Sequence, residues 1–447
     1  IQRTPAGILK QLAIALHHFL KRMQSTYAAQ RSLFHVDQWS PFHVAADSGL
    51  MSLCTHVYGN ADIYQLEDKN PGNKSGTTAL HLAAESGHLE IYRFIMCKVE
   101  NMNPAKKPWA NKYGVREGSQ CTPLHIAARN GHLEICRLIM DSLENKNPAD
   151  ENGTTPLHIS ARIGYYKICE LIINNIENEN VDGINRWSAC TLEIKNPGDI
   201  GGATPLHLAS LNGNLEICQL FMNTLENKNP SNISGVTPLH ISAHEGHLEI
   251  CKLIMDFLED KNSPNDFGIT PLHLASGNGH LEIFQIIIDT LEDKNPPDEF
   301  GVTPLHYASR KGHVEICKII MDTLEDKNPP NNHGITPLHL ASENGHLEVC
   351  QIIIDTLEDK NPPDEGGITP LHYASKKGHV EVCKIIIDTL EDKNPPDQYG
   401  ITPLHLASEK GHLEICRLII DTLKDKNPPN GWGNTPLQIA FEKGHME

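Results

Sequence analysis

The chain has 447 residues, with 38 basic and 56 acidic side chains and a formal charge of −18. This acidic balance argues against a polyanion such as DNA as the main ligand, so no nucleic-acid binding is predicted. Wholly apolar runs are short, such as Leu12 to Leu16. Because a bilayer-crossing helix needs roughly 20 apolar residues, no membrane span is predicted.

The first element in the chain is an amphipathic segment within residues 1–38. An apolar stripe at helical spacing runs along it: Ile8, Leu9, Leu12, Leu16, Phe19, Leu20 and Met23. The favoured interpretation is an N-terminal helical cap that covers the first layer of the array that follows. Because Lys10, Lys21 and Arg22 lie on the same segment, a basic anchor for a membrane or a partner is the alternative.

From residue 39 onward a single motif recurs. The prolines of its Thr-Pro-Leu-His form are 33 residues apart except for one step of 49: Pro123, Pro156, Pro205, Pro238, Pro271, Pro304, Pro337, Pro370, Pro403 and Pro436. Looser copies begin at Ser40 and Thr78, which gives about twelve units over residues 39–447. Self-similarity at this period predicts a stacked repeat architecture.

Each unit predicts two antiparallel helices. Threonine is an N-cap, proline fits the first helical position, and histidine occupies the place that Glu or Gln takes in a capping box. Glycine then ends the first helix, and a segment such as His-Leu-Glu-Ile-Cys supplies a second helix with apolar residues at i, i+3, i+4 and i+7. Pro-Pro and a glycine turn follow, and neither helix can bury its apolar face alone.

The pattern G-x-TPLH-x-A-x-x-x-GHLEI at this spacing resembles the ankyrin repeat family. The resemblance implies an all-α repeat solenoid of stacked helix–turn–helix units with projecting β-turn or hairpin loops, forming a curved, elongated superhelix. One feature departs from the family. Leu-Glu-Asp replaces the usual Gly-Ala-Asp after the second helix, as at Leu291, Leu324, Leu357 and Leu390. We therefore expect that helix to run about one turn further.

Two insertions and an incomplete end interrupt the regular phase. About eleven extra residues lie near 102–120 and about sixteen near 176–199, and both segments are predicted to be longer loops. The sequence stops at Gly444 to Glu447, where earlier copies begin their second helix, so the last repeat is predicted to be incomplete. Since the chain also begins at Ile1, we expect a fragment or a processed form.

Nine of the twelve cysteines share one phase of the repeat: Cys54, Cys136, Cys169, Cys218, Cys251, Cys317, Cys350, Cys383 and Cys416. Equivalent positions in stacked helices lie roughly 10 Å apart, beyond the ~7 Å limit between Cα atoms for a disulfide. We therefore predict reduced core thiols and a cytoplasmic or nuclear location.

The histidines also recur in two phases. One follows Thr-Pro-Leu, at His125, His158, His207, His240, His273, His306, His339, His372 and His405. The other follows glycine, at His88, His132, His247, His280, His313, His346, His379 and His412. Residues of one phase lie too far apart to share a metal, so we expect hydrogen-bonded structural histidines. No metal site, cofactor, catalytic residue or enzymatic activity is predicted.

The resemblance implies that first helices and turn tips line a concave groove whose variable positions bind the partner. The turn-tip position is occupied by Phe267, Phe300, His333, Gly366, Tyr399 and Trp432. The two residues before the helix-ending glycine are also expected to face the groove: Arg310 and Lys311, Lys376 and Lys377, Glu409 and Lys410, with His244 and Glu245 earlier. The basic ones are the expected partner-binding residues: Arg310, Lys311, Lys376, Lys377 and Lys410. Tyr307 and Tyr373 accompany the basic pairs, which indicates a 66-residue super-period.

The predicted function is a non-catalytic protein–protein interaction scaffold that binds an acidic, partly apolar protein or peptide along this groove. Two alternatives stay open: the cytosolic ankyrin region of a larger membrane protein such as a channel, and a secreted toxin-like ankyrin protein. The oligomeric state is not predicted. The resemblance also implies candidate hydroxylation sites at the asparagine after the second helix: Asn262, Asn295, Asn328, Asn361, Asn394 and Asn427. The favoured interpretation is structural, because asparagine side chains commonly cap turns.

Overall fold

A computed structural model describes residues 40–59, 70–73, 75–106, 109–110, 116–117, 120–178 and 195–445. The predicted N-terminal cap, residues 1–38, lies outside the described residues. The chain forms two compact units, residues 1–233 and 234–447, and each is described by itself.

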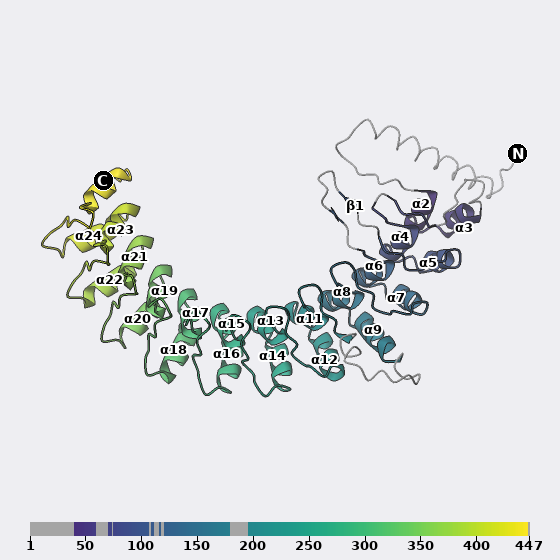
Figure 1. Cartoon of the computed structure of the whole chain (residues 1–447), viewed down its shortest axis with the longest axis horizontal. Coiled ribbons are helices and arrows are strands. Elements are labelled where there is room, and N and C mark those ends of the chain that lie inside the picture. The colour runs from purple at the N-terminus through teal and green to yellow at the C-terminus, as the bar shows by residue number, and fades with distance from the viewer. Residues whose placement is uncertain are drawn as a thin grey trace. The chain divides into compact units, whose positions relative to one another are not determined.

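The first unit consists of helix pairs in series (Figure 1). Its helices are α2 (Pro41–Asp47), α3 (Met51–Gly59), α4 (Ala79–Glu85), α5 (Leu89–Met96), α6 (Pro123–Asn130), α7 (Leu133–Met140), α8 (Pro156–Ile163), α9 (Tyr166–Asn178), α11 (Pro205–Leu211) and α12 (Leu215–Thr224). The first helix of each pair packs against the first helices of neighbouring pairs, and the second helices form their own row.

The second unit repeats this arrangement more regularly. Its helices are α13 (Pro238–Glu245), α14 (Leu248–Met255), α15 (Pro271–Asn278), α16 (Leu281–Ile288), α17 (Pro304–Lys311), α18 (Val314–Thr323), α19 (Pro337–Asn344), α20 (Leu347–Ile354), α21 (Pro370–Lys377), α22 (Val380–Thr389), α23 (Pro403–Lys410), α24 (Leu413–Ile420) and α25 (Pro436–Glu442). Both units are all-α repeat solenoids, as the sequence predicts.

The first helix begins and ends where local chemistry dictates. In α19 the threonine N-cap, Thr336, is paired with His339 in a capping box, and proline occupies the first turn. Gly345 ends the helix with φ 75°, in the left-handed region that favours glycine. The predicted start and stop of this helix are therefore confirmed.

The second helix does not run a turn further, so that prediction is wrong. In α18 the C-cap is Leu324, whose backbone is extended at φ −93° and ψ 149°. The lysine of the following loop reaches back and donates to the carbonyls that the helix leaves open. In the preceding repeat, Lys294 Nζ lies 2.6 Å from the carbonyl oxygen of Ile288. A cation at this end is favoured by the helix dipole, which stabilises the early stop.

The insertions differ in detail from the predicted loops. Near 102–120, two short strands, β1 (Trp109–Ala110) and β2 (Arg116–Glu117), pair antiparallel, with Trp109 opposite Glu117 and Ala110 opposite Arg116. Near 176–199, α9 continues to Asn178, and Ile176 is buried. The predicted loop therefore begins at least three residues too early, because Ile176 extends the apolar face of the helix.

The core consists of aliphatic side chains with the repeated cysteine among them. Cys350 is fully buried, and Cys317 and Cys383 are its equivalents in the neighbouring repeats. The eleven cysteines of the described residues are all free, which agrees with the predicted reduced thiols. Within the same part of the chain, no helix has the length and apolar character needed to cross a membrane.

Candidate protein-binding surface

Within each unit, the histidine after Thr-Pro-Leu joins one repeat to the next. In α19, Nδ1 of His339 accepts a hydrogen bond from the backbone N–H of Thr336 at 3.1 Å. Its Nε2 lies 3.1 Å from the carbonyl oxygen of Ile368 in the next repeat, and donates to it. Both ring nitrogens are used by the backbone, which confirms the predicted structural role.

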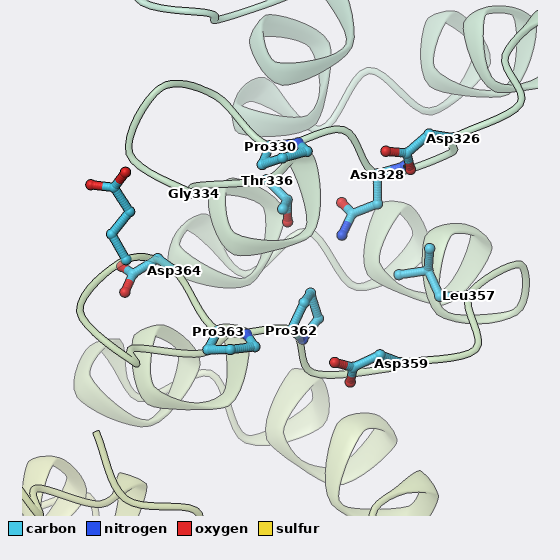
Figure 2. A pocket seen from close by; sticks show the side chains of 11 residues that line it. Asp326, Asn328, Pro330, Gly334, Thr336, Leu357, Asp359, Pro362, Pro363 and Asp364 are labelled. Atoms are coloured by element: carbon cyan, nitrogen blue, oxygen red, sulfur yellow. The ribbon is translucent and has the colours of Figure 1, made fainter. Parts of the chain in front are cut away.

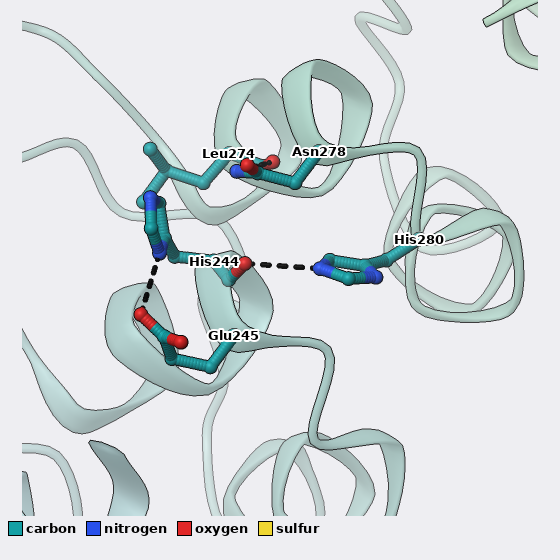
Figure 3. Close-up of polar contacts among 5 residues, drawn as sticks. All are labelled: His244, Glu245, Leu274, Asn278 and His280. Carbon is teal, nitrogen blue, oxygen red and sulfur yellow. Dashed lines mark hydrogen bonds and ion pairs between the residues drawn. The ribbon is translucent and has the colours of Figure 1, made fainter.

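Within each unit, the histidine after glycine joins its repeat to the one before it. Figure 3 shows Nε2 of His280 3.0 Å from the carbonyl oxygen of His244. Asn214 takes the place of this histidine in one repeat, and its Nδ2 donates to the carbonyl of Ala161 at 2.7 Å. An amide can make the same hydrogen bond as an imidazole, which explains why this substitution is tolerated.

Burial lowers the basicity of the first histidine series. Desolvation lowers the pKa of His273, His306 and His339 to about 4, partly offset by the hydrogen bond that each imidazole donates. These rings are therefore neutral at pH 7. Burial likewise raises the pKa of the Cys350 thiol to about 12, so this sulfur is not a thiolate nucleophile at neutral pH. No cluster of three or more His, Cys, Asp or Glu side chains suited to a metal is found in the described residues.

The predicted turn-tip residues form one row along the second unit. Phe267, Phe300, His333, Tyr399 and Trp432 are exposed, and Gly366 is half-buried. Backbone hydrogen bonds join neighbouring tips: Glu299 N–H donates to the carbonyl of Phe267 at 3.2 Å, and Gly431 N–H donates to that of Tyr399 at 2.8 Å. The turn tips are thus held in register although their side chains face solvent.

The last two tips form an aromatic pair. The rings of Tyr399 and Trp432 stack with centroids 5.7 Å apart and an interplanar angle of 18°. Both side chains nevertheless stay 54% and 64% exposed. A Cβ at Gly431 would lie 2.6 Å from the Tyr399 carbonyl oxygen, so glycine is needed for the tips to approach this closely. The pair offers a flat apolar surface to a partner.

The predicted basic residues lie at the C-terminal ends of the first helices, and all five are exposed: Arg310, Lys311, Lys376, Lys377 and Lys410. Two of them have acidic partners. Lys377 Nζ lies 3.2 Å from Oε1 of Glu343 in the preceding repeat, and Lys410 Nζ lies 3.1 Å from Oε1 of Glu409. No salt bridge within the described residues involves Arg310, Lys311 or Lys376.

The tyrosines of the super-period contact histidines of the preceding repeats. Tyr307 packs edge-on against His273 of the preceding repeat, with ring centroids 5.3 Å apart. Tyr373 does the same against His339, with ring centroids 5.7 Å apart. The alternation is also visible in the second helices, since α18 and α22 have ten residues where α16, α20 and α24 have eight.

The long loops after the second helices carry the opposite charge. Figure 2 shows two successive loops with acidic side chains and prolines around a hollow, among them Asp326, Asp359, Asp364, Pro330 and Pro362. The volume of this hollow is about 500 Å³. A similar hollow of about 400 Å³ occurs one repeat earlier. The loop lysine caps the preceding helix: Lys360 Nζ lies 2.5 Å from the carbonyl oxygen of Ile354. The sequence alone did not reveal this use of lysine.

The asparagine between the loop lysine and the Pro-Pro pair acts as a cap across the loop. Oδ1 of Asn361 accepts from the backbone N–H of Leu371, ten residues later, at 2.9 Å. Asn295 and Asn328 make the same contact with Leu305 and Leu338. The predicted structural use is confirmed. Hydroxylation of these side chains stays a prediction.

Comparison with known protein families agrees with this geometry. A family model described as ankyrin repeats (three copies) matches residues 8–108, 107–183, 179–265, 254–331, 322–397 and 389–447. The chain belongs to the ankyrin repeat family. Ankyrin repeats are generally protein–protein interaction modules. A search of curated proteins found no match.

Proposed function

We propose that the chain is a non-catalytic scaffold whose second unit binds an acidic, partly apolar peptide or protein segment. The surface consists of the turn-tip row and the basic ends of the first helices, from Phe267 to Trp432. The observation that supports this most strongly is the Tyr399–Trp432 pair, because two large aromatic rings stay more than half exposed. Exposed aromatic anchors are typical of interface hot spots.

The charge distribution supports an acidic partner despite the net charge of −18. Arg310, Lys311 and Lys376 are exposed on the first helices without a salt bridge to another described residue. The exposed acids are concentrated elsewhere, on the loops after the second helices, as at Asp326 and Asp359. Long-range repulsion is screened within roughly 8 Å at physiological ionic strength, so the local positive charge decides the contact.

The test uses a displayed library of random twelve-residue peptides selected on the full chain. Peptides that bind should be enriched in Asp, Glu and apolar residues, and their affinity can be measured by fluorescence anisotropy. Replacing both Tyr399 and Trp432 by alanine should weaken binding by roughly tenfold or more, because this removes two aromatic anchors. Unchanged circular dichroism would show that the repeats are intact.

Phe257 provides a matched control. Its side chain is 50% exposed, the same fraction as that of Phe267, but it lies in the loop after α14 and outside the turn-tip row. Phe257→Ala should leave peptide affinity unchanged. Selection of basic peptides, or equal binding by the Tyr399→Ala/Trp432→Ala variant, would contradict the proposed surface.

We also propose a reducing compartment, cytoplasmic or nuclear, for this scaffold. The support is chemical: buried free thiols such as Cys317 and Cys350 occur in successive repeats, and proteins of oxidising compartments generally use cysteine for disulfides. Neither a membrane-protein context nor secretion is favoured by a specific structural observation.

A further inference from the structure

Charge alternates along the first helices of the second unit. Arg310 and Lys311 end α17, Glu343 and Asn344 end α19, and Lys376 and Lys377 end α21. The three ends therefore present positive, negative and positive charge in successive repeats. The end of α23 carries one charge of each sign, because Glu409 and Lys410 are adjacent and form a salt bridge of 3.1 Å.

The central negative position is held in place by its neighbour. Glu343 Oε1 lies 3.2 Å from Lys377 Nζ, and both side chains keep part of their surface exposed, 32% and 48%. A cation on a partner could approach Glu343 and release Lys377 to meet an anion. The basic ends of α17 and α21 each lie one repeat away from Glu343, on opposite sides of it.

The spacing of these ends suits a polyproline II peptide. Packed helices lie about 8–10 Å apart, so equivalent ends of successive first helices have that pitch. A polyproline II chain has three residues per turn and a rise of about 3.1 Å per residue, or about 9 Å per turn. Residues i, i+3 and i+6 of such a peptide point the same way and would meet three successive repeats. A β-strand lacks this match, because its side chains alternate with period two.

We infer that the second unit selects a polyproline II segment with the charge order acidic-x-x-basic-x-x-acidic. The two acidic side chains meet the basic ends of α17 and α21, and the basic side chain meets Glu343. This inference rests on the proposed function and names the partner of the same surface. The proposed function requires only an acidic peptide. The inference also requires a particular order of the charges along that peptide.

The test compares labelled peptides of identical composition by fluorescence anisotropy with the full chain. One contains Glu-Pro-Pro-Lys-Pro-Pro-Glu, and the other contains Lys-Pro-Pro-Glu-Pro-Pro-Glu. Each exposed ion pair contributes only modestly, so we expect the first peptide to bind roughly fivefold more tightly. The difference should shrink at high salt.

Variants of Glu343 separate charge order from other effects. Glu343→Gln should reduce the preference between the two peptides to less than about twofold, because it removes the central charge. Glu343→Lys should make a third peptide, Glu-Pro-Pro-Glu-Pro-Pro-Glu, bind more tightly than the first. Glu409→Gln serves as the matched control, because Glu409 lies one repeat beyond the ends of α17, α19 and α21. This variant should preserve the preference between the two peptides.

The outcomes distinguish a failure of the inferred charge order from a failure of the proposed function. Equal binding of the two composition-matched peptides, with binding still lost in the Tyr399→Ala/Trp432→Ala variant, would overturn the charge order and leave the proposed surface standing. If neither those alanines nor charge reversal at Arg310 and Lys376 weakened the binding of any acidic peptide, the proposed surface itself would be wrong. A preference that survives Glu343→Gln would also overturn the inferred order.

Discussion

The Nε2 atom of His339 lies 3.1 Å from the carbonyl oxygen of Ile368, 29 positions later in the chain. The same histidine accepts the N–H of Thr336 through Nδ1. One neutral imidazole thus caps its own helix and joins two repeats, which is possible only if Nε2 carries the proton. This contact explains why a titratable residue recurs in the core of a binding scaffold.

Acid should destabilise the array through these histidines. The pKa of His339 is lowered from 6.5 to about 4, so the unfolded state binds protons first as the pH falls. The stabilising contribution of His339 is fully present above pH 6.5 and is lost as the pH falls from there towards 4, at roughly 3 kcal/mol. Urea denaturation midpoints at pH 7.5, 6, 5 and 4.5 would measure the loss.

A glutamine variant tests the same histidine directly. Gln438 accepts the N–H of Thr435 at 2.9 Å in the last repeat, so glutamine can replace histidine in this capping box. His339→Gln should therefore reduce the pH dependence of the urea midpoint by the share of one histidine while retaining a folded array. An undiminished pH dependence in His339→Gln would show that other groups cause the acid sensitivity.

Truncation of the repeated leucine should weaken several layers at once. Leu338 is fully buried in α19, which packs against α17 and α21. Leu338→Ala should cost about 2–5 kcal/mol, because it leaves a cavity, and hydrogen exchange should accelerate in the neighbouring helices as well. Leu340→Ala, at a half-buried position of the same helix, should cost less. An unchanged urea midpoint for Leu338→Ala would contradict the assigned core.

Loss of an asparagine cap should expose one specific backbone amide. Asn361 is 7% exposed, and its Oδ1 accepts the N–H of Leu371 at 2.9 Å. Asn361→Ala should cost about 1–3 kcal/mol, because a buried donor loses its acceptor. Asn361→Asp keeps an acceptor and should cost less. Faster hydrogen exchange of Leu371 in the alanine variant, measured by mass spectrometry, is the expected signature.

The cysteines should differ sharply in reactivity. Cys97 is exposed, whereas Cys350 is buried, and burial raises the pKa of its thiol to about 12. A maleimide reagent should therefore label Cys97 quickly in the native protein and Cys350 only after unfolding. Peptide mapping by mass spectrometry would measure both sites in one sample. Rapid native labelling of Cys350 would contradict its place in the core.

Much of the candidate surface could be predicted because exposure follows from phase in a repeat. The tips Tyr399 and Trp432 and the basic residues Arg310 and Lys376 are exposed, as their positions predict. Their partners could not be predicted, because a side chain of an adjacent repeat is distant in sequence. The pairing of Lys377 with Glu343 and the stacking of Tyr399 on Trp432 depend on how repeats pack side by side.

The sequence by itself determined the helix pairs, since the threonine cap, the proline, the glycine and the apolar spacing act within a few residues of one another. It also determined that these pairs must stack, because neither helix buries its apolar face alone. Only the tertiary structure decided where the second nitrogen of each histidine donates, that Lys294 and Lys360 cap helix ends, and that Tyr307 packs on His273. Those contacts depend on three-dimensional distances between groups whose local sequence permits several partners.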